Sequence, residues 1–253
     1  MTKDLASKID SANLPGHLAE DLHQLASTVA DIRPLHPQQL HYQIDFAQRT
    51  ILGEVLEPQE QQAHWWQTGL YLINDIAKRD PGLHQSVVKL TERLSKELTT
   101  RLGPYDQVSL REITSQTLLG ICILSELMVH PQNTFVAPNV YSIAQAQYHP
   151  TAWLRAIYAG SAPVGFIMLD DNADKPEYFL WRFMIAPHFQ GHNYGAQAIA
   201  ELVNYVKTRP CATELMVSYI DHQEGPANFY ARQGFQETGE IIDGEVLARL
   251  ELT

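Results

Sequence analysis

Apolar side chains recur at every third or fourth position through the first 102 residues, which predicts helices that bury one face. The clearest stripes are Leu18, Leu22, Leu25 and Val29, and farther on Val87, Leu90, Leu94 and Leu98. The strict apolar–polar alternation of a half-buried strand does not occur in this part of the chain. We therefore predict a small all-α bundle of roughly four helices, with the adjacent Trp65 and Trp66 in its core.

Two prolines in this part indicate where helices begin. Proline suits the first helical position, because the N–H that it lacks would have no partner there. Glu57-Pro58 thus predicts a helix that runs to Lys78, and Asp80-Pro81 predicts the next one. Gly103-Pro104 is expected to end that helix and to open a linker that reaches Gln107. The helical domain is therefore expected to span residues 1–104.

Short β-prone runs alternate with helical stretches from Val108 onward. The expected strands cover 108–111, 153–159, 164–169, 178–185, 214–218 and 246–250. The expected helices cover 117–128, 139–148, 196–207 and 226–233. Strands interleaved with helices predict a mixed α/β (α+β) domain over residues 105–253, with one central sheet flanked by helices.

Composition narrows the classes of protein. The formal net charge is −11 and lysine and arginine form no cluster, which disfavours a nucleic-acid binder. No basic leader precedes an apolar run and no stretch approaches about 18 apolar residues, so we expect a cytoplasmic protein that does not engage a membrane. Cys122 and Cys211 lack ligand companions, and no histidine pair has the spacing of a helical zinc site, so no metal is expected.

The segment from Phe179 to Ala196 places an apolar strand, a turn with two glycines and an amphipathic helix in direct succession. Glycines let backbone N–H groups approach a ligand closely, and a helix start adds positive potential, which suits a pyrophosphate. The pattern is neither a Walker loop nor a dinucleotide fingerprint. The same pattern also occurs as a plain strand–helix connection, so these residues alone leave both readings open.

Several motifs resemble the GNAT N-acetyltransferase family. The stretch Gln190-Gly191-His192-Asn193-Tyr194-Gly195 resembles its acetyl-coenzyme A loop, Arg/Gln-x-x-Gly-x-Gly/Ala, and the stretch from Asn228 to Phe235 resembles its Tyr-x-x-x-Gly-Phe signature. Further stretches at 135–139, 142–146, 164–168, 238–240 and 244–245 resemble the spermine/spermidine acetyltransferase branch. The resemblance covers about 108–250 and implies a GNAT-like fold that uses acetyl-coenzyme A.

The resemblance also implies where acetyl-coenzyme A would bind. The implied residues are Phe183, Met184, Ile185, Gln190, Gly191, His192, Asn193, Tyr194, Gly195 and Ala196. The strands are expected to splay near Ile185 and Ser218, with the pantetheine paired to the backbone of Phe183 and Ile185. Asn193 stands where the family pattern has a glycine. Asparagine is the non-glycine residue best able to hold a positive φ, but its Cβ could crowd the phosphates.

Tyr230 is implied as the general acid that protonates the leaving thiolate, since a phenol with a pKa of ~10 stays protonated at neutral pH. Its alternative role is an aromatic packed between helix and sheet. The base is left open among Asp170, Asp171, Glu177, Glu240 and a water chain. His188 and His192 flank the loop and either supply charge there or have no role. Arg182 is expected to pair with an acid such as Glu245.

The resemblance and the negative net charge of the second domain favour a small cationic amine as the acceptor of the acetyl group. A polyamine such as spermidine or spermine is the first candidate. Residues through Asp106 carry 10 basic and 14 acidic groups, and those after it carry 8 and 15, so the second domain would attract a cation. An aminoglycoside, another small amine or a protein N-terminus stays open. The rival hypothesis is an acetyl-coenzyme A sensor or interaction protein with little turnover. The helical domain could cap the acceptor site, form a homodimer or contact a partner.

Overall fold

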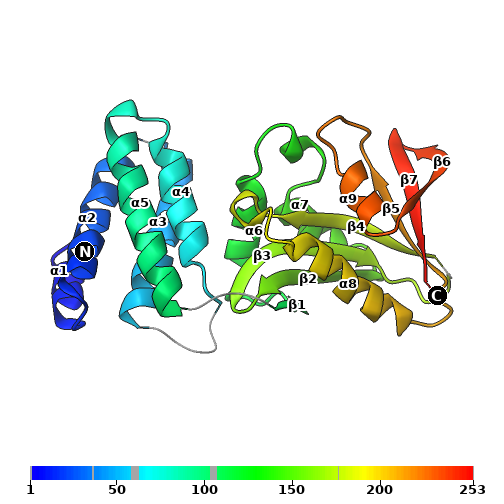
Figure 1. The fold of residues 1–253 in the computed structure, drawn as a ribbon, viewed down its shortest axis with the longest axis horizontal. Helices are drawn as coiled ribbons and strands as arrows, with labels where there is room; N and C mark the ends of the chain where they lie inside the picture. The colour runs from blue at the N-terminus through cyan, green and yellow to red at the C-terminus, as the bar shows by residue number, and fades with distance from the viewer. Residues whose placement is uncertain (1, 36, 58–62, 103–106, 176, 253) are drawn as a thin grey trace. The chain divides into compact units, whose positions relative to one another are not determined.

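A computed structural model describes residues 2–35, 37–57, 63–102, 107–175 and 177–252. The chain divides into two compact units, Met1–Tyr105 and Asp106–Thr253, which follow the colour bar from blue to red in Figure 1. The predicted boundary between residues 104 and 105 lies outside the described residues. No described helix is both long enough and apolar enough to cross a membrane.

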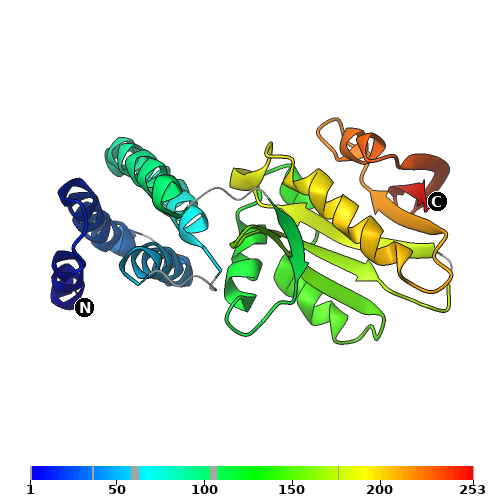
Figure 2. The same cartoon turned by 60° about the horizontal axis from the view of Figure 1, so that its bottom comes forward.

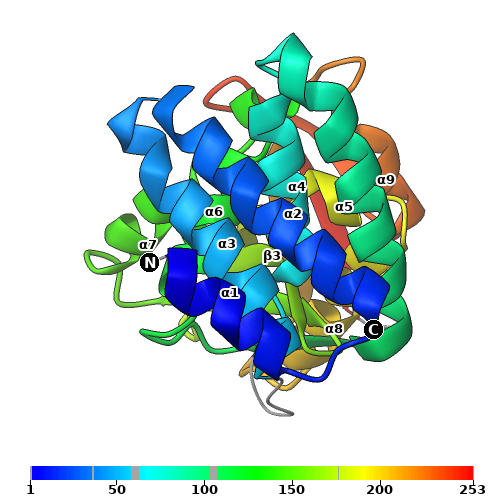
Figure 3. The same ribbon diagram turned by 90° about the vertical axis from the view of Figure 1, so that its left-hand side faces the viewer.

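The first unit is a helical bundle, as predicted. Its α-helices are α1 (Thr2–Ser11), α2 (Gly16–Ile32), α3 (His41–Leu56), α4 (Trp66–Ala77) and α5 (Pro81–Leu102), with short 3-10 turns at Arg33–Leu35 and Gln38–Leu40. Helices α2 to α5 pack against one another and α1 lies against α2 (Figure 3). Both predicted apolar stripes are buried, and so are Trp65 and Trp66; the Trp65 ring packs edge-on against Phe46 at 5.5 Å.

The helix predicted to begin at Glu57-Pro58 begins only at Trp66, so that prediction is wrong in its start. The reason is a contact across the bundle. The Glu54 carboxylate, on α3, accepts hydrogen bonds from the backbone N–H groups of Trp65 (2.5 Å) and Trp66 (3.0 Å). The first N–H groups of a helix lack intrahelical partners, so an acceptor from a neighbouring helix can fix where it starts. The predicted start at Asp80-Pro81 is confirmed, whereas the predicted stop at Gly103-Pro104 lies outside the described residues.

Glu54 should make the stability of this unit depend on pH. Burial raises its pKa to about 7, against the lowering effect of the Trp65 and Trp66 N–H groups. An unfolded glutamate titrates near 4.5, so between these values only the folded protein keeps the proton. The free energy of unfolding should therefore fall by up to about 3 kcal/mol as pH rises through this window.

A Glu54→Gln variant should lose most of this pH dependence. Thermal unfolding of the full chain at about pH 5 and about pH 8 measures it: the wild-type midpoint should drop and the variant midpoint should drop less. Equal drops in both proteins would contradict the role of Glu54.

The second unit is a mixed α/β domain built on one seven-stranded sheet of order β1-β2-β3-β4-β5-β7-β6. The strands are β1 (Val108–Arg111), β2 (Ala152–Ala159), β3 (Ala162–Asp170), β4 (Glu177–Ile185), β5 (Glu214–Tyr219), β6 (Gln236–Ile242) and β7 (Glu245–Glu251). The helices are α6 (Leu118–Glu126), α7 (Asn139–Ala146), α8 (Tyr194–Lys207) and α9 (Ala227–Arg232), with 3-10 turns at Gln132–Thr134 and Pro187–Phe189. Each predicted element is present, with bounds that shift by no more than two residues.

The strand β6 was not predicted. Six of its seven residues are exposed, so it lacks the apolar alternation by which a strand is recognised. The centre of the sheet is buried on both faces, since every β3 residue from Ala162 to Leu169 is buried. Helix α8 contacts β1 and β4, α6 contacts β3 and α7 contacts β2. Figure 2 shows α8 (gold) lying along the sheet.

Candidate active site

The strands β4 and β5 separate halfway along β4. They are the parallel pair of the sheet, and their register runs only from Glu177–Glu214 to Leu180–Val217. From Trp181 to Ile185, β4 stays paired with β3 alone. The backbone groups on its other edge are therefore left without a partner strand, as the predicted splay near Ile185 and Ser218 requires.

The period of the strand decides which residues face this gap. The Ala186 N–H donates to the Val164 carbonyl on β3 at 2.9 Å. Successive residues of a strand direct their backbone groups to opposite edges, so Met184 faces β3 while Phe183 and Ile185 face the gap. These are the two residues predicted to pair with a pantetheine. An added strand would meet their N–H groups and the Phe183 C=O there, whereas the Ile185 C=O already accepts from the Gln190 side chain.

The glycine turn brings an uncapped helix start to the end of β4. Gly191 has φ +80° with open space where a Cβ would be, and Asn193 holds φ 64° in the left-handed region. Helix α8 begins directly at Tyr194, and no side chain caps its first turn. The N–H groups of that turn lack intrahelical partners, which makes this helix start a favourable place for an anion.

One cavity of about 900 Å³ joins these features. Every predicted cofactor residue lines it except His192. Its wall also includes Tyr230 on α9, Ser218 and Tyr219 on β5, and Glu245 at the start of β7. The gap in the sheet, the helix start and a phenol thus meet in one space.

Tyr230 is buried at the wall of this cavity, with 6% of its surface exposed. Its ring stacks on Tyr219 at 5.5 Å and meets Phe229 and Phe235 edge-on. Burial, with the negative charge of Glu245, raises the pKa of Tyr230 well above its usual range. The phenol therefore holds its proton throughout the physiological range, as a general acid must before it donates. Both predicted roles, packing and proton donation, are compatible with this position.

Residues 123–235 match the sequence model of the acetyltransferase (GNAT) family, which is less than half of the 253-residue chain. This segment is therefore similar to the GNAT family, and we call the unit that contains it, Asp106–Thr253, the GNAT domain. The predicted resemblance is confirmed at that level, and with it an acetyltransferase domain; the spermine/spermidine branch stays a prediction.

Solved structures resemble the GNAT domain at low sequence identity. An acetyltransferase from Thermus thermophilus is 16% identical, covers 59% of this chain and 99% of its own, and has a TM-score of 0.46. A GNAT family acetyltransferase from Elizabethkingia anophelis with acetyl-coenzyme A bound is 17% identical (58% and 99% covered, TM-score 0.44). The spermidine/spermine N-acetyltransferase of Vibrio cholerae is 17% identical (58% and 95%, TM-score 0.44). No curated protein sequence matches the chain.

Two predicted phosphate-loop side chains are engaged elsewhere in the GNAT domain. The Gln190 amide donates to the Ile185 carbonyl at 2.9 Å and exchanges hydrogen bonds with the Gln132 amide. The His192 ring stacks on Tyr194 at 5.6 Å and lies outside the cavity lining. His188 supplies no charge at neutral pH, because burial lowers its pKa to about 3. The feature of this loop that suits an anion is therefore its backbone, not these side chains.

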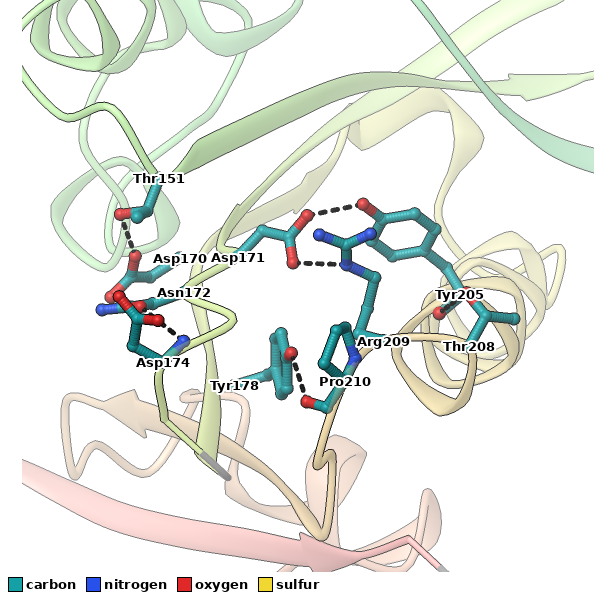
Figure 4. A network of polar contacts seen from close by, with 10 residues as sticks. All are labelled: Thr151, Asp170, Asp171, Asn172, Asp174, Tyr178, Tyr205, Thr208, Arg209 and Pro210. Atoms are coloured by element: carbon teal, nitrogen blue, oxygen red, sulfur yellow. Dashed lines mark hydrogen bonds and ion pairs between the residues drawn. The ribbon is translucent and has the colours of Figure 1, made fainter.

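The four acids proposed as bases lie away from the cavity. Figure 4 shows Asp170 and Asp171 in a network at the far end of β3 and β4: Asp170 accepts from Thr151, and Asp171 accepts from Tyr205 at 2.6 Å and Arg209 at 2.7 Å. In the same network the Tyr178 hydroxyl donates to the Pro210 carbonyl at 2.8 Å. Glu177 begins β4 opposite Glu214, and Glu240 is exposed on β6; none of the four lines the cavity. The structure therefore does not bring these four acids together with Tyr230 at the cavity wall.

The expected ion pair of Arg182 with Glu245 is also not formed. Within the described part of the chain Arg182 makes no ion pair; its Nη1 donates to the Trp181 carbonyl at 2.8 Å. The Glu245 carboxylate instead accepts from the Ser218 hydroxyl. Sequence reasoning expected the sheet to open near Ser218 but missed Glu245 as a wall residue, because the hairpin of β6 and β7 that carries Glu245 to the cavity was not predicted.

Proposed function

We propose that the GNAT domain transfers the acetyl group of acetyl-coenzyme A to a primary amine by direct attack on the thioester. One observation supports this most: the unpaired edge of β4, the uncapped start of α8 and the protonated Tyr230 line one cavity. In this proposal the pyrophosphate meets the N–H groups of the turn from Gly191 to Ala196, and the pantetheine pairs with Phe183 and Ile185.

The same backbone edge would assist the chemistry. The Ile185 N–H faces the gap, where it can donate to the thioester carbonyl as negative charge develops on that oxygen. Tyr230 would then protonate the sulfur as the C–S bond breaks. The side chains at β4 contribute little to this step, because backbone groups supply the hydrogen bonds.

A polyamine is the proposed acceptor. The described domain lies in the more acidic part of the chain, which would draw a polycation towards it. The cavity wall itself is charge-balanced, with Glu224 and Glu245 against Arg182 and Arg232. In a panel of amines, the most informative comparison with a polyamine is therefore an acceptor that carries a carboxylate beside its amine.

Two measurements on the full chain test the proposal. Calorimetry should show binding of coenzyme A and of acetyl-coenzyme A. Thiol release should then occur with spermidine and spermine, and more slowly with an aminoglycoside, an amino acid or a peptide N-terminus. Failure to bind either form of coenzyme A would overturn the proposal, and binding without release for any amine would favour the sensor hypothesis.

The conformation of Asn193 predicts how the loop responds to substitution. A β-branched residue at φ 64° is strongly disfavoured, whereas glycine adopts this conformation freely. Asn193→Val should weaken acetyl-coenzyme A binding at least about tenfold, and Asn193→Gly should leave it within about threefold. Calorimetric dissociation constants measure both. Equal affinities for the valine and glycine variants would show that the turn does not hold the phosphates.

A further inference from the structure

Glu245 is the acid that the fold brings to the reacting end of the cavity. It is half-buried at the start of β7, where the pairing of β7 with β5 sets Val246 opposite Tyr219. The Ser218 hydroxyl donates to its Oε2. The carboxylate is thus held by a hydrogen bond from β5, and the residue lines the cavity.

Glu245 lines the cavity together with Tyr230, on α9, and Arg182, on β4. Its negative charge raises the pKa of Tyr230, on α9, and counteracts the lowering of the Arg182 pKa on β4. The other acid of the wall, Glu224, is exposed on the loop before α9.

We infer that the Glu245 carboxylate binds the ammonium group of the acceptor in the cavity and takes a proton from it before the nitrogen attacks. This inference rests on the proposed function. A protonated amine has no lone pair for attack, and the acids expected to remove that proton lie elsewhere. Glu245 is the half-buried carboxylate of the wall that is already ordered by a hydrogen bond, so it needs little reorganisation to receive a cation.

The protons balance in the following way. The ammonium gives one proton to Glu245, and the free amine forms a C–N bond to the thioester carbon. The C–S bond breaks and the sulfur takes the Tyr230 proton. The nitrogen, now an amide, sheds its surplus proton, which restores Tyr230, and Glu245 returns its proton to water. The products are the acetylated amine and coenzyme A.

A Glu245→Gln variant tests the inference through turnover. At pH 7 its kcat/KM for spermidine should fall at least about tenfold, because the amide neither attracts the cation nor accepts its proton. The deficit should shrink towards about pH 9, where more of the amine is already unprotonated in solution. Ser218→Ala should give a smaller fall in the same direction. A Glu245→Gln deficit that stays constant with pH would overturn the proton transfer.

The matched control is Asp243→Asn, which removes the same charge from the exposed turn of the same hairpin. It should leave kcat/KM and the acetyl-coenzyme A dissociation constant unchanged. A second readout does not depend on turnover: calorimetric binding of spermidine to the coenzyme A complex should weaken at least about tenfold in Glu245→Gln. Unaltered spermidine binding in that variant would overturn the ammonium site. If the wild type binds spermidine through Glu245 but releases no thiol from acetyl-coenzyme A with any amine, the proposed function is overturned and the ammonium site is kept.

Discussion

Tyr230→Phe should lose at least about a hundredfold in kcat while it keeps its fold and its affinity for acetyl-coenzyme A. The substitution removes one hydroxyl and leaves the ring contacts with Tyr219, Phe229 and Phe235 in place. The leaving thiolate would then lose the proton that this phenol supplies. Steady-state thiol release, calorimetric binding and thermal unfolding of the variant separate these effects.

The control for this variant is Tyr178→Phe. The Tyr178 hydroxyl donates to the Pro210 carbonyl in the network of Figure 4, outside the cavity lining. Removal of this hydroxyl should lower the free energy of unfolding by roughly 1 kcal/mol and leave kcat unchanged. A Tyr230→Phe variant with near-normal kcat would assign Tyr230 to packing and leave the acid to another group.

Gly165→Ala should strongly destabilise the GNAT domain. A Cβ at this position would lie 2.2 Å from the Met184 carbonyl oxygen and 2.9 Å from the Ile185 Cδ1. The obstacle is backbone, so β3 and β4 must move apart where β4 borders the gap. Overpacking costs about 1–3 kcal/mol in general, and we expect a loss of about 3 kcal/mol or more. The thermal midpoint of the domain should fall by about 6–12 °C or more.

The same substitution should weaken acetyl-coenzyme A binding, because Ile185 and the edge that faces the gap shift with β4. Gly53→Ala is the control for the chemical change: a Cβ there meets nothing within 4 Å, and a helical alanine should stabilise by about 0.5–1 kcal/mol. Calorimetric unfolding and cofactor titration measure both variants. A Gly165→Ala protein with an unchanged midpoint would show that β3 and β4 tolerate the added methyl group.

Local chemistry explains which features were predictable. The apolar stripes of α2 and α5 indicate these helices because each helix buries one face, and the spacing of that face does not depend on which elements pack against it. Asn193 was expected to hold a positive φ, and it does, because that preference belongs to the residue. The start of α4 was not predictable, since it depends on Glu54 from another helix. The strand β6 was missed because its residues are mostly exposed.

The sequence by itself determined the helical bundle, the α/β domain with its helices and its strands other than β6, and the turn from Gln190 to Gly195 that carries the resemblance to the family. These features depend on residues that are close in the sequence: the spacing of apolar side chains, and the backbone preferences of proline and glycine. Only the tertiary structure decided which acids share a space with Tyr230. Asp170 and Asp171 close a network at the far end of the sheet, whereas Glu245 reaches the cavity. Glu245 reaches the cavity because β7 pairs with β5, and these strands lie about 30 residues apart in the sequence. A pattern of neighbouring residues does not predict such a contact.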